Sequence, residues 1–388
     1  MHKMRIVALS FLLGITFFLI GSSRPKPNAG QIPVKVVVVA MFESGKDTGD
    51  TPGELQYWVE RDHLDTVYRL PAAFHSARMN GAGELAIVTG PGTAHAAATI
   101  MALGLDPRFD LSNAYWVIAG TAGGNPENTS LGSAVWSNWI VDGDLRHEID
   151  EREIPAAWQT GILPLRKKEP FEGPPAPLQG QIYQTNRGLM LWAYGLTKGL
   201  TLQDSDQLKE IRSHFDGAAA QNPPQVLLGD EVSSSSYWHG KLMNTWAERW
   251  MSYFTQGEGH FATTAMEDSG TLQSLQFLAR AGRVDWNRIL VLRTVSNFDQ
   301  QPVGMDAASS LAAQQADGRY GAYLPSLESA YTVGHAVAGE LIKNWNQYEV
   351  DVPAASESKT AEKERRHGVR SKPVPVSPLS AQYPAKIP

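Results

Sequence analysis

The chain has 388 residues, of which 42% are hydrophobic and 19% charged, so it carries enough apolar material for a large folded core. Its formal net charge of −6 at pH 7 argues against a nucleic-acid partner, because binding to a phosphate backbone requires a basic surface. The absence of cysteine excludes disulfides, thiolate catalysis and cysteine-ligated metal sites.

The first 23 residues have the pattern of a secretory signal. His2, Lys3 and Arg5 precede an apolar run over residues 6–20, and small residues follow at 21–23. We therefore predict a signal peptide over residues 1–23, a linker over 24–33, and export to the periplasm or the medium. The alternative is an uncleaved membrane anchor at residues 6–20, although this run is shorter than the roughly 20 residues that a spanning helix needs.

Residues 34–350 are predicted to form one α/β domain, because short apolar runs alternate with helical patterns, as in folds with a mostly parallel sheet. The predicted strands cover residues 34–40, 85–88, 115–119, 226–228 and 289–292, and the predicted helices cover 93–103, 241–254, 267–281 and 326–345. The proline-rich stretch 158–177 is expected to leave the sheet as a lid or a partner-contact loop. Residues 351–388 have few large apolar side chains and are predicted to be a flexible tail.

Each predicted strand is followed by glycine, hydroxyl, carboxylate or amide residues. Ligands of open α/β sheets bind outside the carboxyl ends of the strands, so we expect these residues to form one polar site. The chain has no phosphate-binding loop, dinucleotide fingerprint, zinc-protease motif or nucleophile elbow. We therefore expect no metal and no cofactor.

The order of these motifs resembles the nucleoside phosphorylase superfamily, and within it the purine nucleoside permease family. The resemblance extends over residues 34–345 and rests on AMFES (40–44), TGPGTAHAAATIMAL (89–103), GTAGG (120–124), LGDE (228–231), AMEDSG (265–270) and RTVSN (293–297). It implies a single domain with a central mixed, twisted sheet flanked by helices and one purine nucleoside site. Relatives are usually oligomers, so a homo-oligomer is expected, with Trp136, Trp139 and the stretch 158–177 as candidate contacts.

The resemblance also implies roles for the last two motifs. Met266 and Glu267 match the pair in which the glutamate binds the ribose 2′- and 3′-hydroxyls; alternatively, Glu267 only favours a helix N-terminus. Asn297 matches the residue that reads the purine N7, where many relatives have an aspartate that protonates the base. Asn297 cannot transfer a proton, but its side-chain amide can donate a hydrogen bond to N7. Asp299 could supply the proton instead, and Asn297 could equally do no more than shape a turn.

Base binding is expected from the GTAGG motif and from two aromatic residues. Thr121, Ala122 and Gly123 match the loop that lies against the base, where small residues let the backbone approach a flat ring. Tyr237 or Trp238 is predicted to stack on the purine, with core packing as the alternative.

The nucleophile is expected in the first two loops. Glu43 lies near the position of the glutamate that activates water in nucleosidases, with Ser44 beside it. A phosphate, as co-substrate, would instead be held by Thr89, Gly90, Thr93 and His95, with Arg78 and Arg187 completing the site. Hydrolysis is slightly favoured because these two loops contain no arginine.

The sequence thus predicts a protein that binds purine nucleosides and cleaves their N-glycosidic bond, as a nucleosidase or a phosphorylase. The alternative is a nucleoside-capture component of uptake that does not cleave. Membrane contact is expected only through the N-terminal segment.

Overall fold

The computed structural model describes residues 30–316 and 321–355. The predicted signal segment and most of the predicted tail lie outside these residues. At the two ends of the described part, β1 (Ile32–Pro33) pairs with β6 (Phe109–Asp110), and the Ala355 amide donates to the Gly188 carbonyl at 2.9 Å.

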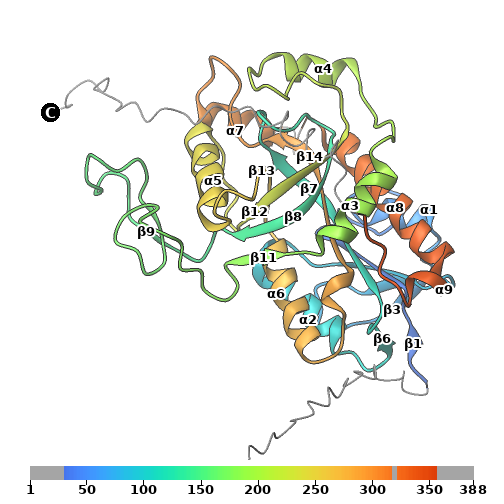
Figure 1. Cartoon of the computed structure of the whole chain (residues 1–388). Coiled ribbons are helices and arrows are strands. Elements are labelled where there is room, and N and C mark those ends of the chain that lie inside the picture. Colours follow the sequence, from blue (N-terminus) through green and yellow to red (C-terminus); the bar gives the residue numbers. More distant parts are fainter. Residues whose placement is uncertain (1–29, 317–320, 356–388) are drawn as a thin grey trace, which may run out of the picture.

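The described residues contain a ten-stranded mixed sheet flanked by helices, which confirms the predicted fold class (Figure 1). Its strands are β2 (Val36–Ala40), β3 (Thr66–Tyr68), β4 (Ala77–Met79), β5 (Glu84–Val88), β7 (Tyr115–Gly124), β8 (Ala134–Asp142), β11 (Ile182–Gln184), β12 (Val226–Ser233), β13 (Phe261–Ala265) and β14 (Ile289–Phe298). The sheet is mixed, as the resemblance implied. Its longest pairs, such as β7 with β14 and β8 with β12, are parallel, and shorter pairs, such as β13 with β7 and β14 with β8, are antiparallel. The expectation of a mostly parallel sheet therefore holds for the long pairs only.

Five of these strands close into a ring. One edge of β7 pairs with β14 along most of its length, and β14 continues the ring through β8, β12 and β13. The other edge of β7 pairs with β2 near its start and with β13 at Gly123 and Gly124. Because β13 runs antiparallel to β7 and overlaps it only there, the carboxyl ends of the two strands meet. This meeting point positions the candidate site.

Two motifs that were predicted to be loops belong to strands. The strands predicted at 115–119 and 289–292 extend to Gly124 and Phe298, so that GTAGG and RTVSN pair with each other. Gly120 faces Arg293 across the pair, and Gly123 faces Asn297 after a bulge between Val295 and Asn297. The polar side chains of β14 are buried, and their contacts lie inside the fold rather than in solvent.

Helices cover both faces of the sheet, which explains the unbroken apolar run of β2. Val36, Val38 and Ala40 share one core cluster with α8, and Val37 and Val39 share another with α2 and α6. The helices are α1 (Gln56–Arg61), α2 (Gly92–Gly104), α3 (Arg187–Thr197), α4 (Asp206–Ser213), α5 (Lys241–Phe254), α6 (Asp268–Arg280), α7 (Ala307–Ala316), α8 (Tyr323–Lys343) and α9 (Trp345–Tyr348), with a 3-10 turn, η1, at Trp286–Arg288. The four predicted helices correspond to α2, α5, α6 and α8, whereas α1, α3, α4 and α7 were not predicted.

Helices α2 and α6 pack closely because a glycine lies at their contact. A Cβ atom at Gly270 would lie 2.1 Å from the carbonyl oxygen of Thr93. Only the missing side chain allows this approach, which brings the first turn of α2 next to the residue before α6.

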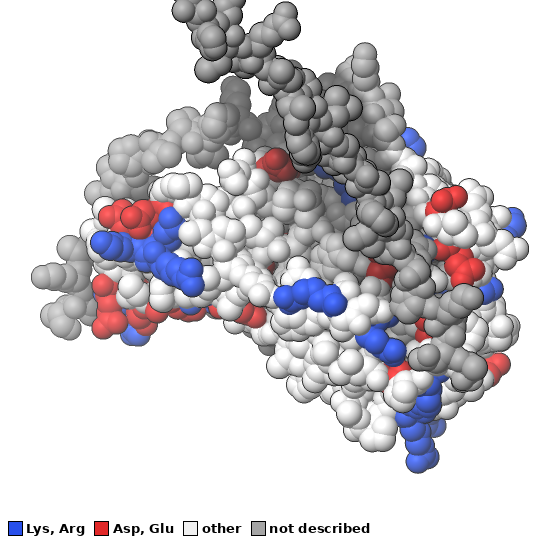
Figure 2. All heavy atoms as spheres, turned by 60° about the horizontal axis from the view of Figure 1, so that its bottom comes forward, with Lys and Arg blue, Asp and Glu red and all other residues white. Residues whose placement is uncertain are grey.

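Residues 144–180 leave the sheet, as the proline-rich stretch predicted, and form an arm around the hairpin of β9 (Arg146–Glu148) and β10 (Ile162–Pro164) (Figure 1). On the face in Figure 2, basic and acidic side chains form small groups of both signs among uncharged residues. Trp136 is fully buried and its indole N–H donates to Thr197, so the prediction that it contacts another subunit was wrong. Among helices in the described ranges, none has the length and apolar character to cross a bilayer.

Candidate active site at the meeting strand ends

Glu267 lies where α6 begins and α2 approaches it. Its Oε1 accepts a hydrogen bond from the Gly92 amide at 3.1 Å, and its Oε2 accepts one from the Met266 amide at 3.2 Å. The residue is only 6% exposed, and burial raises the pKa of its carboxyl although Arg293 opposes the shift. The structure thus brings Met266 and Glu267, the predicted ribose pair, next to the loop at Gly92, which was predicted to hold phosphate.

Arg293 is the centre of a buried charge cluster. Its guanidinium makes two hydrogen bonds to Asp268 and one to the Thr121 carbonyl, and it lies 3.4 Å from Glu267 Oε2. Glu231 approaches its Nε at 3.5 Å. The arginine belongs to the RTVSN motif, but no role was predicted for it, because a single arginine in an apolar strand gives no sign of its partners.

Glu231 is the least satisfied member of this cluster. Neither of its carboxyl oxygens has a hydrogen-bond partner among the described residues, and it is fully buried. Burial and the neighbouring Asp268 raise its pKa well above the ordinary value, whereas Arg293 lowers it.

Glu54 also reaches this cluster and was not predicted. Its Oε1 accepts from the Thr121 amide at 2.6 Å and from the Thr121 hydroxyl at 3.0 Å, and its Oε2 accepts from the Met41 amide at 2.7 Å. Burial raises the pKa of its carboxyl to about 7, against the attraction of Arg293. Gly120 makes room here, because a Cβ atom would lie 2.7 Å from Arg293 Nη1 and 2.9 Å from Glu54 Oε1.

Glu43, the predicted water activator, organises the loop that carries Glu54. Its carboxylate accepts hydrogen bonds from the backbone amides of Ser44, Gly53, Leu55 and Gln56. Burial raises the pKa of this carboxyl, and the four amides act in the opposite direction. These bonds fold residues 43–56 into a turn that ends at α1, with Ser44 exposed.

The loop between β5 and the first turn of α2 presents mainly hydroxyl and backbone amide groups. The Thr93 amide and hydroxyl contact Ser235 Oγ at 3.0 and 2.6 Å, whereas the buried Thr89 hydroxyl donates to the Gly90 carbonyl. Gly90 adopts a φ of +82°, and a Cβ there would meet the ring of Phe74. The exposed His95 contacts the same ring edge-on, with centroids 5.4 Å apart.

The two arginines proposed for phosphate have other positions. Arg78 pairs with Asp47, which also contacts His75 at 3.0 Å. Arg187 begins α3, and its neighbour Asn186 bonds to the Asn287 carbonyl, at the amino end of β14 and therefore away from Asn297. Within the described ranges, the cation at the strand ends is Arg293, and carboxylates surround it.

At the other end of the cluster, Asn297 lies beside the GTAGG segment. Its Nδ2 donates to the Tyr237 hydroxyl and to the Phe298 carbonyl, each at 3.1 Å, and its Oδ1 accepts from Ser296 at 3.0 Å. A Cβ on Gly123 would lie 3.1 Å from Thr264 Cγ2 and 3.5 Å from this Nδ2, so the missing side chain lets β7 lie close to both residues. Tyr237 is 40% exposed and can reach a ligand.

Trp238 and Asp299, which were predicted to stack on the purine and to supply a proton, are buried in contacts with other parts of the fold. Trp238 is buried in a cluster with Trp246 and Phe261, with ring centroids 6.3 and 6.2 Å away, which is the core-packing alternative. Asp299 is fully buried, and its carboxyl accepts from Asn244 of α5 at 2.9 and 3.0 Å. Burial raises the pKa of Asp299 well above its ordinary value.

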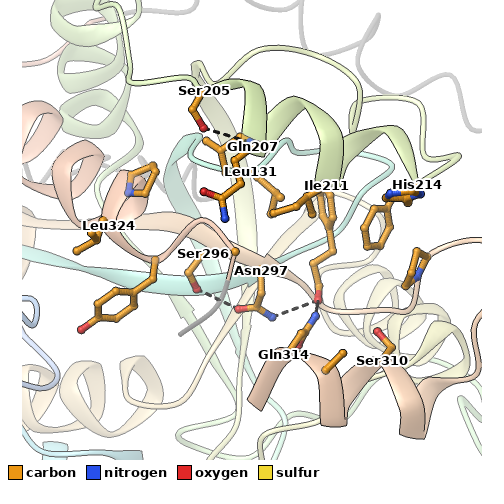
Figure 3. Close-up of a pocket in the computed structure, with 18 of the residues that line it drawn as sticks. Leu131, Ser205, Gln207, Ile211, His214, Ser296, Asn297, Ser310, Gln314 and Leu324 are labelled. Carbon is orange, nitrogen blue, oxygen red and sulfur yellow. Dashed lines mark hydrogen bonds between the residues drawn. The ribbon is translucent and has the colours of Figure 1, made fainter. Parts of the chain in front are cut away.

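A cavity of about 590 Å³ borders Asn297 (Figure 3). Its floor is formed by Ser296, Asn297 and Phe298, and Gln314 of α7 donates to the Phe298 carbonyl at 3.2 Å. Helix α4 and the start of α8 complete the walls.

Residues 33–353 match the model of a family described as purine nucleoside permease. A probable purine nucleoside permease of Schizosaccharomyces pombe is 29% identical over 273 residues, which cover 68% of this chain and 76% of that protein. The purine nucleoside permease of Candida albicans is 29% identical over 265 residues, which cover 67% of this chain and 64% of that protein.

Solved structures that align with this chain include a nucleosidase and a hydrolase. The 5′-methylthioadenosine/S-adenosylhomocysteine nucleosidase of Neisseria meningitidis aligns with a TM-score of 0.45 at 15% identity and covers 78% of this chain and 99% of its own. The futalosine hydrolase of Helicobacter pylori aligns with a TM-score of 0.46 at 13% identity and covers 79% and 98%.

Proposed function

The chain belongs to the purine nucleoside permease family, and we propose that it binds a purine nucleoside between Glu267 and Asn297 and hydrolyses its N-glycosidic bond. Glu267 binds the ribose hydroxyls, because its carboxylate is held in place by two backbone amides and Arg293. The base lies along Thr121–Gly123, whose small side chains admit a flat ring, and Tyr237 covers it.

The observation that carries hydrolysis is the position of Glu54. A buried carboxyl with a pKa of about 7 is suited to accept a proton from water near neutral pH. The water oxygen bonds to C1′ of the ribose and its proton passes to Glu54, while the bond from C1′ to the base breaks and its electron pair leaves with the base. Free ribose and free base are the products, and the departing base takes a proton from solvent.

Asn297 stabilises the leaving base. The Nδ2 hydrogen that now points to the Tyr237 hydroxyl turns to N7, where negative charge develops as the bond breaks. The carboxylates around Arg293 stabilise the positive charge that forms on the ribose ring at the same moment.

The same charges favour water over phosphate as the nucleophile. Arg293 is occupied by Asp268, Glu267 and Glu231, and Arg78 is paired with Asp47. A phosphate would therefore meet mostly negative charge beside Glu267 and find hydroxyls and amides in the second loop.

Two points favour a second function, capture of nucleosides for uptake without cleavage. Asn297 replaces a proton donor with a group that can only form hydrogen bonds, and the relatives are named permeases. Such a protein would bind nucleosides in the same cleft and release them intact. We further propose that residues 1–23 direct export and that the protein acts as a homo-oligomer outside the cytoplasm.

The deciding experiment is to incubate the purified protein with adenosine, guanosine and inosine, with and without phosphate, and to separate the products by chromatography. Free base without phosphate supports hydrolysis by water held at Glu54. Base released only with phosphate, together with ribose 1-phosphate, refutes it in favour of phosphorolysis. Calorimetric binding with intact nucleoside recovered supports capture.

A further inference from the structure

We propose that the cavity beside Asn297 receives an apolar group on the exocyclic 6-position of the purine, so that the preferred ligands are purine nucleosides enlarged at that position. This inference rests on the proposed binding of a purine with its N7 at Asn297. It goes beyond it by naming the class of substituent that the site selects.

The cavity has the size and lining of a ligand pocket. Its volume of about 590 Å³ falls inside the range of roughly 300–1,000 Å³ that holds drug-sized molecules, which are larger than an unsubstituted base. Polar side chains gather on its floor at Ser296, Asn297 and Gln314, whereas its walls are mostly apolar (Figure 3). The large apolar wall residues are Leu131, Leu208, Ile211, Phe215, Met305 and Leu324, and polar side chains among them are Ser205, Gln207, His214, Ser310 and Tyr323.

The cavity continues the nucleoside site on one particular edge of the base. The adenine N7 and the exocyclic 6-amino group lie on the same edge of the ring, so a side chain that reads N7 is a neighbour of the 6-substituent. Asn297 belongs both to the amide network with Tyr237 and to the cavity floor. A group on the 6-position therefore points toward α4 and α7 rather than toward the ribose end.

The lining decides which substituent fits. An alkyl or benzyl group loses water-exposed apolar surface against Leu208, Ile211 and Phe215, which stabilises the complex in proportion to the area buried. Hydroxyl-bearing substituents of the same length gain less, because they bury less apolar surface and because the wall hydroxyls of Ser205 and Ser310 already bond to the Leu208 amide and to His239.

The test measures binding of adenosine, N6-benzyladenosine and N6-(2-hydroxyethyl)adenosine to the full chain by calorimetry. We expect the benzyl compound to bind at least about tenfold more tightly than adenosine. The affinity of the hydroxyethyl compound should remain close to that of adenosine. Binding of adenosine with exclusion of the benzyl compound would overturn the inference and leave the proposed function intact. Failure of all three to bind would instead overturn the proposed function.

Three variants locate the effect: two fill the cavity and one is a control outside it. Ala313→Trp fills the cavity from α7, and its expected result is a loss of the preference for the benzyl compound, by tenfold or more relative to adenosine. Ala312→Trp adds the same side chain at the exposed neighbouring position, outside the lining, and the preference should persist. Leu324→Trp fills the cavity from α8 as a second variant. If thermally stable Ala313→Trp and Leu324→Trp proteins both keep the preference, the substituent binds elsewhere and the assignment is wrong.

Discussion

Arg293 of β14 and Asp268 of α6 form an ion pair with two hydrogen bonds, and neither side chain is exposed to solvent. Two further carboxyls, Glu267 and Glu231, lie within 3.5 Å of the same guanidinium. This pair ties the last sheet strand to the helix that begins directly after the candidate ribose ligand, Glu267. Ligand geometry and fold stability therefore depend on one arginine.

Arg293→Met should strongly destabilise the protein. The substitution leaves Asp268 and Glu267 buried without their cation, and breaking a buried pair in this way costs about 3–5 kcal/mol. Denaturant unfolding would measure the loss. Arg152→Met removes an exposed pair with Asp150 and should leave the midpoint unchanged. Equal midpoints for both variants would contradict the role given to Arg293.

Glu54→Gln tests the water activator. An amide cannot accept the proton, so we expect turnover to fall by about 10²–10⁴-fold while nucleoside affinity changes little. In the unchanged protein, turnover should rise with pH through about 7, because Glu54 must lose its own proton to act as a base. The control is Glu60→Gln on the exposed face of α1. Full activity of Glu54→Gln would require a different base.

Two substitutions of Asn297 distinguish hydrogen bonding to the leaving base from proton transfer to it. Asn297→Ala should lower turnover by about 10²–10³-fold, since the charge on the leaving base loses its donor. Asn297→Asp restores a donor only while the new carboxyl is protonated, so its turnover should fall on the alkaline side. Melting temperatures check that both variants fold, and unchanged turnover in Asn297→Ala would remove this residue from the mechanism.

A second group of buried acids predicts how stability depends on pH. Burial and the neighbouring Asp62 raise the pKa of Glu84 to about 8, far above its ordinary value of 4.5. Because the folded-state pKa is the higher one, the protonated carboxyl contributes fully at pH 4.5, and this contribution is lost as the pH rises toward 8.

Glu84→Gln should therefore improve stability at alkaline pH relative to the unchanged protein. Between pH 5 and 8.5 we expect the difference in unfolding free energy to grow by about 1–3 kcal/mol in favour of the variant. Urea unfolding at several pH values measures it, with the exposed Glu153→Gln as control. A difference that is constant with pH would show that Glu84 does not titrate in this range.

Two glycine substitutions test the close approach at the site. A Cβ at Gly120 would lie 2.4 Å from the Met41 sulfur and 2.7 Å from Arg293 Nη1, so Gly120→Ala should cost about 1–3 kcal/mol. Gly195 lies in α3 with nothing within 4 Å of the added atom. There the same substitution should stabilise by roughly 0.5–1 kcal/mol, since alanine favours a helix interior. Thermal unfolding compares the two.

Local pattern predicted much of the framework. The apolar run of β2 and the helical spacing of α5 specify the elements by themselves, because burial on both faces and a 3.6-residue period leave direct marks in a sequence. Short helices such as α1 and α4 escaped prediction, since six or eight residues offer little periodicity. The strands β7 and β14 were predicted too short, because their polar ends look like turns until they are paired.

The sequence alone determined the chemistry available: a mixed α/β domain, the family, and the residue types at the strand ends. Only the tertiary structure decided which carboxyls act together. Glu54 is one of 40 acidic residues, and nothing near it in sequence distinguishes it from Glu43. The fold turns Glu43 toward backbone amides and Glu54 toward Arg293. The energy of a buried charge depends on its distance from other charges and from water, and chain folding sets both distances.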